Sequence, residues 1–469
     1  MKHFIKFAAF CRRDTRDPVS KPEGFTRTFY GKYLHHYGSN FRLAYPVALS
    51  LAGQMVVGLA DTLMVGRLGA TPLAAVSLAN NIFVIGLVFG IGLATGLTPL
   101  TGKDYAAGNR RAATEWFMNG ILVFPIIAII QALLMALVVF LLPYMGQPAD
   151  AVKLAIPYYL TLVVSLLPFM FFIVFKQYTE GLGNTRIAMC ITISVNVINI
   201  VLNYLLIYGK HGFPELGALG AGIATLVARL LMPVVFVMVF LKQPFFRPDV
   251  ENLRKCSLSM KAVKRLLRLG FPIAGQLIVE VVTWSVGSIM MGWLGAAALA
   301  ANQIALSLSS LTYMVASGFA AAATIKVSHF RGQKEIKQAK NAAFASLHQA
   351  LIFMGISVMF FILFRFKIPA LFIRDEEVIK IAAMLMLIAG LYQFFDGMQV
   401  VMLGSLRGFE DAKIPMIILT VVYFFVALPV CYIMAFILKL GAAGIWIGYL
   451  AGLFLVSTLL LLRFRRLTD

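Results

Sequence analysis

Apolar residues along the chain gather in twelve long runs, and short polar segments separate one run from the next. Each run holds about 20 residues, which is the length that an α-helix needs to cross the hydrocarbon core of a bilayer. The runs centre near residues 55, 88, 130, 165, 198, 230, 278, 312, 353, 393, 425 and 452. The pattern predicts an all-α fold, a polytopic membrane protein with twelve transmembrane helices.

The two halves of the chain resemble each other. A shift of 226 residues aligns segment 45–79 with segment 271–305 without a gap, and segment 180–189 matches 407–416 at nearly the same shift. Each half holds six runs, so both have the same orientation and a pseudo-twofold axis along the membrane normal relates them. We therefore expect two six-helix lobes. The residue pairs in register include Pro46 with Pro272, Gly66 with Gly292, and Gly69 with Gly295.

Basic residues indicate the topology and the lobe boundaries. Most of the 41 lysines and arginines lie in the two tails and in the segments that follow even-numbered runs. Cytoplasmic loops are enriched in Lys and Arg, so both termini are expected in the cytoplasm. The predicted parts are a cytoplasmic N-terminal tail at 1–42, an N-lobe at 43–241, a cytoplasmic inter-lobe linker at 242–263, and a C-lobe with a short basic tail at 264–469.

Composition supports a membrane protein and argues against a nucleic-acid partner. Hydrophobic residues make up 60% of the chain and charged residues only 13%, about half the charged share of a soluble domain. The formal net charge of +21 is distributed over the short segments between apolar runs. The expected partners are the lipid bilayer and a small molecule, and we expect a monomer that binds no nucleic acid.

Three carboxylates lie inside apolar runs, Asp61 in span one, Glu280 in span seven and Asp396 in span ten. An ionised group at that depth costs about 3 kcal/mol, so such residues normally face the protein interior or a watery cavity. A carboxylate without partners there binds a proton or a cation, which is the physical basis of ion coupling. The structural alternative is a buried acid whose hydrogen bonds hold the fold. Arg229 in span six either pairs with one acid or extends to the membrane interface, and the sequence leaves both open.

Three asparagines of span five are the expected neighbours of Asp61. Asn196, Asn199 and Asn203 have the spacing i, i+3 and i+7, which places their amides along one stripe of a helix. Amide oxygens beside a carboxylate can coordinate a hard cation such as Na⁺. Hydrogen bonding between helices explains the stripe equally well.

The second half arranges its acids differently. Tyr392 lies four residues before Asp396, one helical turn along the same face, where its hydroxyl group can join the same coordination shell. Glu280 lies at another level of its helix than Asp61, and Gly287 stands where Asp61 would map. The halves therefore share their architecture but not their chemistry.

No motif points to catalysis or to a bound cofactor. The chain lacks GxxxxGK[ST], so its own ATP hydrolysis is not expected to drive transport. Its six histidines show no HExxH spacing, which argues against a metalloenzyme. We therefore expect no enzyme activity, no catalytic residue and no cofactor other than a coupling ion.

Several segments carry a family resemblance. They include GLADTLMVGRLG at 58–69, FKQYTEGLGNTRIAM at 175–189 and YQFFDGMQVVMLGSLRGFEDAKIPM at 392–416. From residue 43 to residue 466 the sequence resembles the multidrug and toxic compound extrusion (MATE) transporters, particularly their NorM-like bacterial branch. One departure is PLTGKDYAAGNRR at 99–111, where relatives more usually have a glutamine-bearing segment.

The resemblance implies a cation-coupled exporter whose two six-helix lobes form a V-shaped cavity. It implies an N-lobe polar site and a C-lobe cation site, with Na⁺ as a candidate ion at the second. By motif position, the N-lobe site consists of Asp61, Asn199 and Asn203, and the C-lobe site consists of Glu280, Asp396 and Tyr392.

The predicted function is a cation-coupled (Na⁺ or H⁺) multidrug efflux antiporter of the bacterial inner membrane. It would export organic cations or amphipathic drugs by alternating access. A flippase of lipid-linked glycans is an alternative of related architecture, which a cavity rich in arginine would favour. A membrane-embedded enzyme would need paired catalytic or metal-binding groups, and a channel fits the two-lobe repeat less well. The sequence leaves open the coupling ion, the natural substrate and the lobe that binds the drug.

Overall fold

The computed structural model describes residues 29–469, and within that range every regular element is a helix. Among these residues, twelve helical stretches are long and apolar enough to cross a membrane, and each contains one of the twelve predicted centres. The expected fold class, number and order of spans are confirmed. The interpretation of residues 1–28 as part of a cytoplasmic tail lies outside the described residues.

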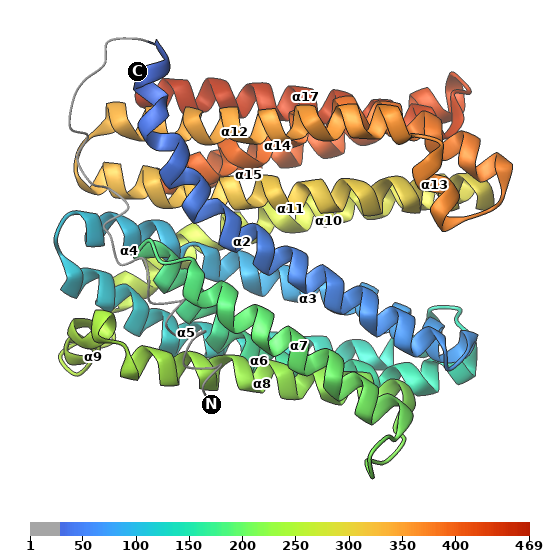
Figure 1. The fold of residues 1–469 in the computed structure, drawn as a ribbon, viewed down its shortest axis with the longest axis horizontal. Coiled ribbons are helices and arrows are strands. Elements are labelled where there is room, and N and C mark those ends of the chain that lie inside the picture. The colour runs from blue at the N-terminus through green and yellow to red at the C-terminus, as the bar shows by residue number, and fades with distance from the viewer. Residues whose placement is uncertain (1–28) are drawn as a thin grey trace. The chain divides into compact units, whose positions relative to one another are not determined.

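Figure 1 shows the helices in chain order. The first six spans are α2 (Phe29–Gly66), α3 with α4 (Ala70–Thr95 and Leu97–Ala106), α5 (Arg110–Leu137), α6 (Ala149–Gly181), α7 (Arg186–Tyr208) and α8 (Gly217–Lys242). The last six are α10 (Met260–Trp293), α11 (Ala296–Gly332), α12 (Ile336–Phe364), α14 (Glu376–Gly408), α15 with α16 (Lys413–Val422 and Leu428–Tyr432) and α17 (Gly441–Thr468). Two short helices lie between spans, α9 (Arg247–Leu253) and α13 (Lys367–Phe372).

The chain divides into two compact units. Residues 49–274 belong to the first unit, and residues 29–48 and 275–469 belong to the second unit. Both boundaries fall inside long helices, α2 and α10, whereas the segment predicted as a linker at 242–263 lies within the first unit. That segment contains α9, which docks on α5 because Asp249 accepts two hydrogen bonds from Arg110, at 2.8 and 2.7 Å.

Helix α6 lies at the centre of the first unit and packs against α3, α4, α5 and α8. Its buried face joins an aromatic cluster in which Tyr178 stacks on Phe117 with 4.2 Å between ring centroids. Such pairs stabilise a core by about 1 kcal/mol beyond the area that they bury. Gly220 lets α8 approach α7, since a Cβ atom there would lie 2.6 Å from the carbonyl oxygen of Leu206. These contacts hold in place three of the helices that border the site described below.

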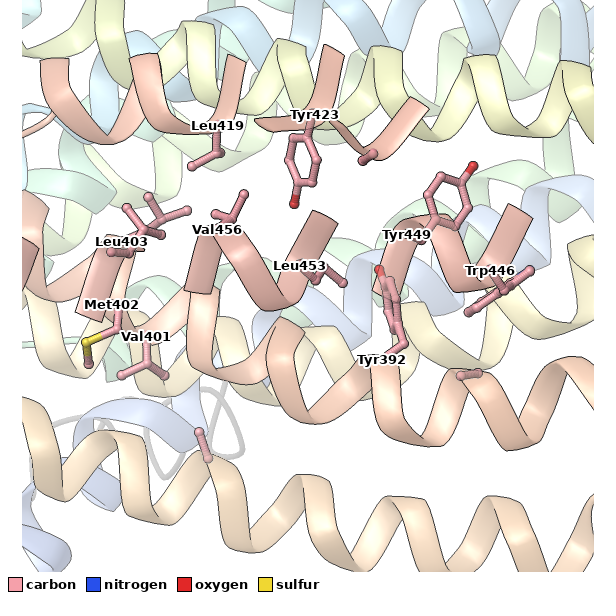
Figure 2. Packing of buried hydrophobic residues seen from close by; sticks show 14 of the residues in the cluster. Tyr392, Val401, Met402, Leu403, Leu419, Tyr423, Trp446, Tyr449, Leu453 and Val456 are labelled. Atoms are coloured by element: carbon pink, nitrogen blue, oxygen red, sulfur yellow. The ribbon is translucent and has the colours of Figure 1, made fainter. Parts of the chain in front are cut away.

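Helices α11 and α14 form the centre of the second unit, and α12 and α17 pack on α14. Thr324 of α11 donates a hydrogen bond to the carbonyl oxygen of Gly404 in α14 at 2.8 Å, and a side chain at Gly404 would collide with the backbone of α11. Figure 2 shows part of the buried cluster, in which Tyr392 of α14 points toward α17 near Tyr449. Close backbone approach and buried rings thus fix the helix that carries the second group of acids.

The N-terminal part of α2 belongs to the second unit. Asn40 donates hydrogen bonds to the carbonyl oxygen of Ala342 at 3.0 Å and to the hydroxyl group of Ser346 at 2.8 Å. Lys326, only 1% exposed, places its Nζ 3.3 Å from Nδ1 of His36. The described part of the predicted tail, residues 29–42, is therefore helical, and at Asn40 it is docked.

Turns that stand 226 or 227 residues apart have the same backbone geometry. Gly69 and Gly295 precede the second and eighth spans with φ angles of 121° and 111°. Gly183 and Glu410 follow the fourth and tenth spans with φ angles of 86° and 61°. A positive φ strains residues that have a Cβ atom, which explains why glycine occupies three of these four positions. The match supports the internal repeat seen in the sequence.

Candidate functional site

The first unit holds a cavity of about 410 Å³ bordered by α2, α3, α6, α7 and α8. This volume falls within the range of pockets that bind small molecules. Its apolar walls include Phe83, Leu87 and Phe169. Its polar lining residues are Gln54, Asp61, Asn80, Tyr158, Asn196, Asn199, Thr225 and Arg229. The structure therefore places one of the three predicted acids and two of the three asparagines at one cavity.

Asn203 joins Asp61 to the asparagine stripe of α7. Its Nδ2 atom donates to Oδ1 of Asp61 and also to Oδ1 of Asn199, the latter at 2.9 Å. Asn199 and Asn203 are 2% and 0% exposed, so the asparagine side of this network is enclosed, whereas Asp61 is half-buried. The Nδ2 atom of Asn196 is buried and has no hydrogen-bond partner in the described part of the chain. Asp61, Asn199 and Asn203 thus form one hydrogen-bonded group, and Asn196 lies apart from it at the cavity wall.

Arg229 takes neither of the two positions that the sequence left open. Its guanidinium group lies over the rings of both Phe83 and Phe169, 5.0 Å from each centroid. Its Nη1 atom donates to Oγ of Ser165 at 2.7 Å. No carboxylate of the described residues forms an ion pair with it, although Asp61 is near enough to attract it. The cavity therefore carries a separated positive and negative charge.

Tyr158 is a cavity residue that sequence reasoning missed. Its hydroxyl group donates to Oδ1 of Asn80 at 3.3 Å, whereas the hydroxyl group of the adjacent Tyr159 donates to the carbonyl oxygen of Met135 at 3.0 Å. The two tyrosines stand side by side in the same apolar run. Only the rotation of α6 about its axis determines which one faces the cavity, and the sequence carries no signal for that rotation.

The second unit buries Glu280 and Asp396, which are 9% and 5% exposed. Gln399 donates through Nε2 to Oε1 of Glu280 at 2.9 Å and accepts at its Oε1 from the hydroxyl group of Tyr423 at 2.7 Å. Asp396 accepts no hydrogen bond from the described residues, and it lies near enough to Glu280 for their negative charges to repel. Glu280 is therefore held by hydrogen bonds that run through Gln399 to Tyr423, whereas the carboxylate of Asp396 is free to bind an ion.

Tyr392 borders both acids and belongs to an aromatic wall. It is 6% exposed and close enough to Asp396 and Glu280 to interact with each of them. Its ring packs edge to face against Trp284, with 5.6 Å between centroids. It also packs edge to face against Trp446, with 5.3 Å between centroids, and Figure 2 shows these two residues. Apolar surroundings of this kind strengthen any electrostatic interaction with the two carboxylates.

Arg407 is a charged neighbour of Glu280 that sequence reasoning did not assign to the site. Its Nη2 and Nε atoms donate to Oε1 of Gln276 at 2.9 and 3.3 Å, and Gln276 in turn donates to the carbonyl oxygen of Ala412 at 2.9 Å. Arg407 is near enough to attract Glu280. Gln276 lies four residues before Glu280, one turn along α10, and that spacing was a signal that pointed to it.

The second group of residues fits a hard monovalent cation or a proton. Two carboxylates and a tyrosine hydroxyl group, from Glu280, Asp396 and Tyr392, supply the oxygen donors that hard cations prefer. Among residues 29–469 there is no group of three or more His, Cys, Asp or Glu side chains that could hold a metal ion. A transition-metal centre therefore has no support in the described part of the chain.

Comparison with known proteins assigns the chain to a family. The MatE family model matches residues 46–205 and 272–433, one segment in each repeat. The chain belongs to the MatE family. The resemblance found in the sequence is confirmed, and so is the expectation of a transporter instead of an enzyme, because MatE proteins are transporters.

MatE relatives cover almost the whole chain. The chain is 32% identical over 431 residues to "Probable multidrug resistance protein NorM" from Pasteurella multocida (strain Pm70), an alignment that covers 91% of this chain and 93% of the relative. It is also 32% identical over 450 residues to "Multidrug resistance protein MdtK" from Yersinia pseudotuberculosis serotype O:1b (strain IP 31758), which covers 92% and 96% of the two chains.

Solved MatE structures share the fold at lower identity. The eukaryotic MATE transporter AtDTX14 matches with a TM-score of 0.82 at 21% identity, over 92% of this chain and 96% of the other. A MATE family transporter in an outward-facing conformation matches with a TM-score of 0.80 at 21% identity, over 95% and 98%. The chain is thus a multi-pass membrane protein of the MatE fold.

Proposed function

We propose that the chain is a multidrug efflux antiporter that exports organic cations and amphipathic drugs against an inward flow of Na⁺ or H⁺. Relatives at 32% identity are named multidrug resistance proteins, which supports small-molecule drugs as substrates. The observation that carries the ion coupling is the pair of buried carboxylates Glu280 and Asp396 in the second unit. Buried acids of a transporter are the usual place where a driving ion binds.

Glu280, Asp396 and Tyr392 form the proposed coupling site. With both acids ionised, their mutual repulsion and their burial make the empty site unfavourable, so it takes up a cation or protons from the outside. Neutralising the charge lowers the cost of enclosing the site in an apolar surrounding, which permits the change of access. Gln399 holds Glu280 in position throughout, since its amide is fixed at the other end by Tyr423.

The cavity of the first unit is the proposed drug site. It combines a volume of about 410 Å³ with apolar walls and the carboxylate of Asp61. A lipophilic cation would gain from burial of its apolar body and from attraction to Asp61. The alternative of a lipid-linked glycan flippase is less well supported, because among the lining residues Arg229 is the single arginine and a pyrophosphate group needs several cationic partners.

The proposed setting is the bacterial inner membrane, with a monomer whose two termini lie in the cytoplasm. Both relatives come from bacteria. Basic residues lie at or directly after the C-terminal ends of the even-numbered spans, as at Lys103, Lys242 and Lys334, and such residues stay on the cytoplasmic side.

Efflux from proteoliposomes tests the proposal. A fluorescent organic cation is loaded, Na⁺ and proton gradients are imposed separately, and wild type is compared with Glu280→Gln, Asp396→Asn and Asp61→Asn. We expect wild type to respond to at least one gradient and the Glu280 and Asp396 variants to lose the response. Asp150→Asn is the matched control, because the Asp150 side chain is 86% exposed. Full gradient-driven efflux by both Glu280→Gln and Asp396→Asn would refute the assignment.

A further inference from the structure

We propose that the start of α10 binds the phosphate groups of anionic phospholipids in the cytoplasmic leaflet of the membrane. Four residues form this surface, called the basic face from here on: Lys261, Lys264, Arg265 and Arg268. None of the four lines the cavity of the first unit, so the basic face is separate from the proposed drug site. Only the side of the membrane on which α10 begins is taken from the proposed function.

The basic face is one continuous side of a helix. Its residues have the spacing i, i+3, i+4 and i+7, which brings them onto one stripe of α10, and all four are exposed. Another side of the same two turns is apolar and buried, at Ala262, Leu266 and Leu269. The protein thus covers the apolar side of this helix and leaves the positive side open to its surroundings.

Little negative charge compensates the basic face within the protein. Three of its four side chains, all except Arg265, form no hydrogen bond or ion pair with any residue of the described chain. Segment 242–271 contains eight basic residues but only two acidic ones, and one of these, Asp249, is already bound to Arg110. Clusters of basic residues directly beside a membrane-spanning stretch attract anionic lipid headgroups, so the charge of this face fits such a partner.

Helix α5 holds the start of α10 in place. Oδ1 of Asn119 accepts a hydrogen bond at 2.9 Å from the backbone N–H of Ser259, one residue before α10 begins. Trp116 lies one turn earlier on α5, and its ring centroid is 5.9 Å from the guanidinium carbon of Arg265. The indole N–H of Trp116 donates to Asp104 at 2.6 Å. Because these contacts fix the helix start, binding of a headgroup has to order little of the backbone.

The basic face lies at the depth of the lipid phosphates if α10 crosses the membrane as its apolar run predicts. Phe271 is exposed and opens that run. With a rise of about 1.5 Å per residue, Arg268 lies about 4.5 Å and Lys264 about 10 Å before Phe271 along the helix axis. One headgroup layer is about 5–8 Å thick, so these side chains reach it. Leu258 and Met260 are also exposed, and apolar residues beside basic ones are typical of segments at a membrane surface.

The internal repeat shows that a helix start of this kind folds without the charges. The shift of 226 residues carries the basic face onto α2, where Arg42, in place of Arg268, is the only lysine or arginine. The position of Lys264 is occupied there by Gly38, which is exposed as well. Since an exposed glycine serves in one repeat, the lysine of the other is not needed for packing and is available for binding.

Quenching of Trp116 by brominated lipids tests the proposal. Wild type is placed in phosphatidylcholine nanodiscs that contain a rising fraction of dibrominated phosphatidylglycerol or of dibrominated phosphatidylcholine. The emission of Trp116 is taken as the part that Trp116→Phe removes. We expect half-maximal quenching at a fraction of the anionic lipid at least about fivefold below that of the neutral lipid, which is the factor expected for one basic residue at the surface. High salt should reduce this preference, because it screens exposed charges.

Two double variants locate the preference. Lys264→Gln combined with Arg268→Gln should bring the half-maximal fractions of the two lipids to within about twofold of each other. Lys153→Gln combined with Lys210→Gln is the matched control and should keep the wild-type preference. The control removes the same charge from two exposed lysines of the first unit, which lie in the segments after odd-numbered spans and thus at the opposite ends of the helices.

Each of the other outcomes would overturn the proposal. Equal quenching by the two lipids in wild type would show that the anionic headgroup is not selected, and this comparison needs no variant to fold. Quenching by neither lipid would place Trp116 and the basic face away from the membrane. Full preference in the Lys264→Gln, Arg268→Gln variant, or an equal loss in the control, would assign the preference to other charges. Efflux does not enter this measurement, so absence of gradient-driven efflux would bear on the proposed function alone.

Discussion

The hydroxyl group of Tyr449 occupies the space in which a side chain at position 287 would lie, and the residue at that position is Gly287. Gly287 stands at the position of α10 that corresponds to Asp61 of α2 in the repeat alignment. A carboxylate is therefore sterically excluded at this level of the second unit. The acids of that unit lie elsewhere, Glu280 two turns earlier on α10 and Asp396 on α14, so the two repeats hold different sites for a steric reason.

The packing of Tyr449 on Gly287 gives a first prediction about stability. Gly287→Ala forces a methyl group into occupied space, and overpacking of this kind costs about 1–3 kcal/mol. The midpoint of thermal unfolding in detergent should fall. Adding Tyr449→Phe should restore part of the loss, because it removes the colliding hydroxyl group. Gly292→Ala on the same helix is the control, since its added methyl group would meet no atom within 4 Å; equal losses in the two alanine variants would contradict the contact.

The relay from Tyr423 through Gln399 to Glu280 gives a prediction about coupling. Gln399→Leu removes both hydrogen bonds of the relay, the one that Gln399 donates to Glu280 and the one that it accepts from Tyr423. We expect the proton concentration at half-maximal efflux to fall by about tenfold, because the variant loses a hydrogen bond that stabilises the ionised, proton-free carboxylate by about 1.5 kcal/mol. Tyr423→Phe leaves the bond between Gln399 and Glu280 in place and should change that concentration by less than about threefold. A larger effect of Tyr423→Phe than of Gln399→Leu would argue against the relay.

The bidentate contact between Arg110 and Asp249 gives a prediction about the segment that docks on α5. Asp249 is 0% exposed, so Asp249→Ala leaves a partly buried guanidinium group without its partner and should destabilise the first unit by about 2 kcal/mol. Thermal unfolding and proteolysis of the segment at 243–259 would both report the change. Asp150→Ala breaks an exposed ion pair of 3.9 Å with Lys153 and should have no measurable effect. Proteolysis of Asp249→Ala at the wild-type rate would show that the contact does not hold α9.

Cys256, between α9 and α10, allows a test of topology and of pH dependence. Burial and the nearby carboxylate of Glu115 raise the pKa of its thiol. The thiolate is the reactive form, so less of it is present at neutral pH and labelling by a maleimide should speed up as the pH rises. A membrane-impermeant maleimide should label Cys256 in inverted vesicles but not in intact cells. The Cys256→Ser variant identifies this label, because it should lack it. The reverse pattern would place this segment outside the cytoplasm.

The sequence predicted the fold well because membrane helices follow local rules. Apolar length alone located all twelve spans, and the glycines at Gly69 and Gly295 marked repeated turns whose positive φ angles require them. The asparagine stripe of α7 was also visible, since helical spacing places Asn199 and Asn203 on one face. That Asn203 reaches Asp61 followed only from the structure.

Contacts between helices were not predictable in the same way. The sequence left open whether Arg229 pairs with an acid or extends to the membrane interface. It does neither, because its position depends on where the rings of Phe83 and Phe169 lie on two other helices. Gln399 was polar without an assigned role, and its place between Glu280 and Tyr423 depends on the rotations of three helices. Pairings of this kind depend on packing between distant segments, for which one sequence has no periodic signal.

The division of α2 between the two units has a consequence for how such a protein can arise and be rebuilt. Its first half is hydrogen-bonded through Asn40 to Ala342 and Ser346 of α12 in the second unit, while its second half carries Asp61 of the first unit. A chain cut between the repeats would leave each fragment lacking a piece that the other holds. Gene duplication can produce the repeat, but the fused protein cannot then be divided between its repeats, because α2 contributes to both units. An engineered hybrid that combines the first unit of one protein with the second unit of another should therefore take the first half of α2 from the protein that supplies the second unit.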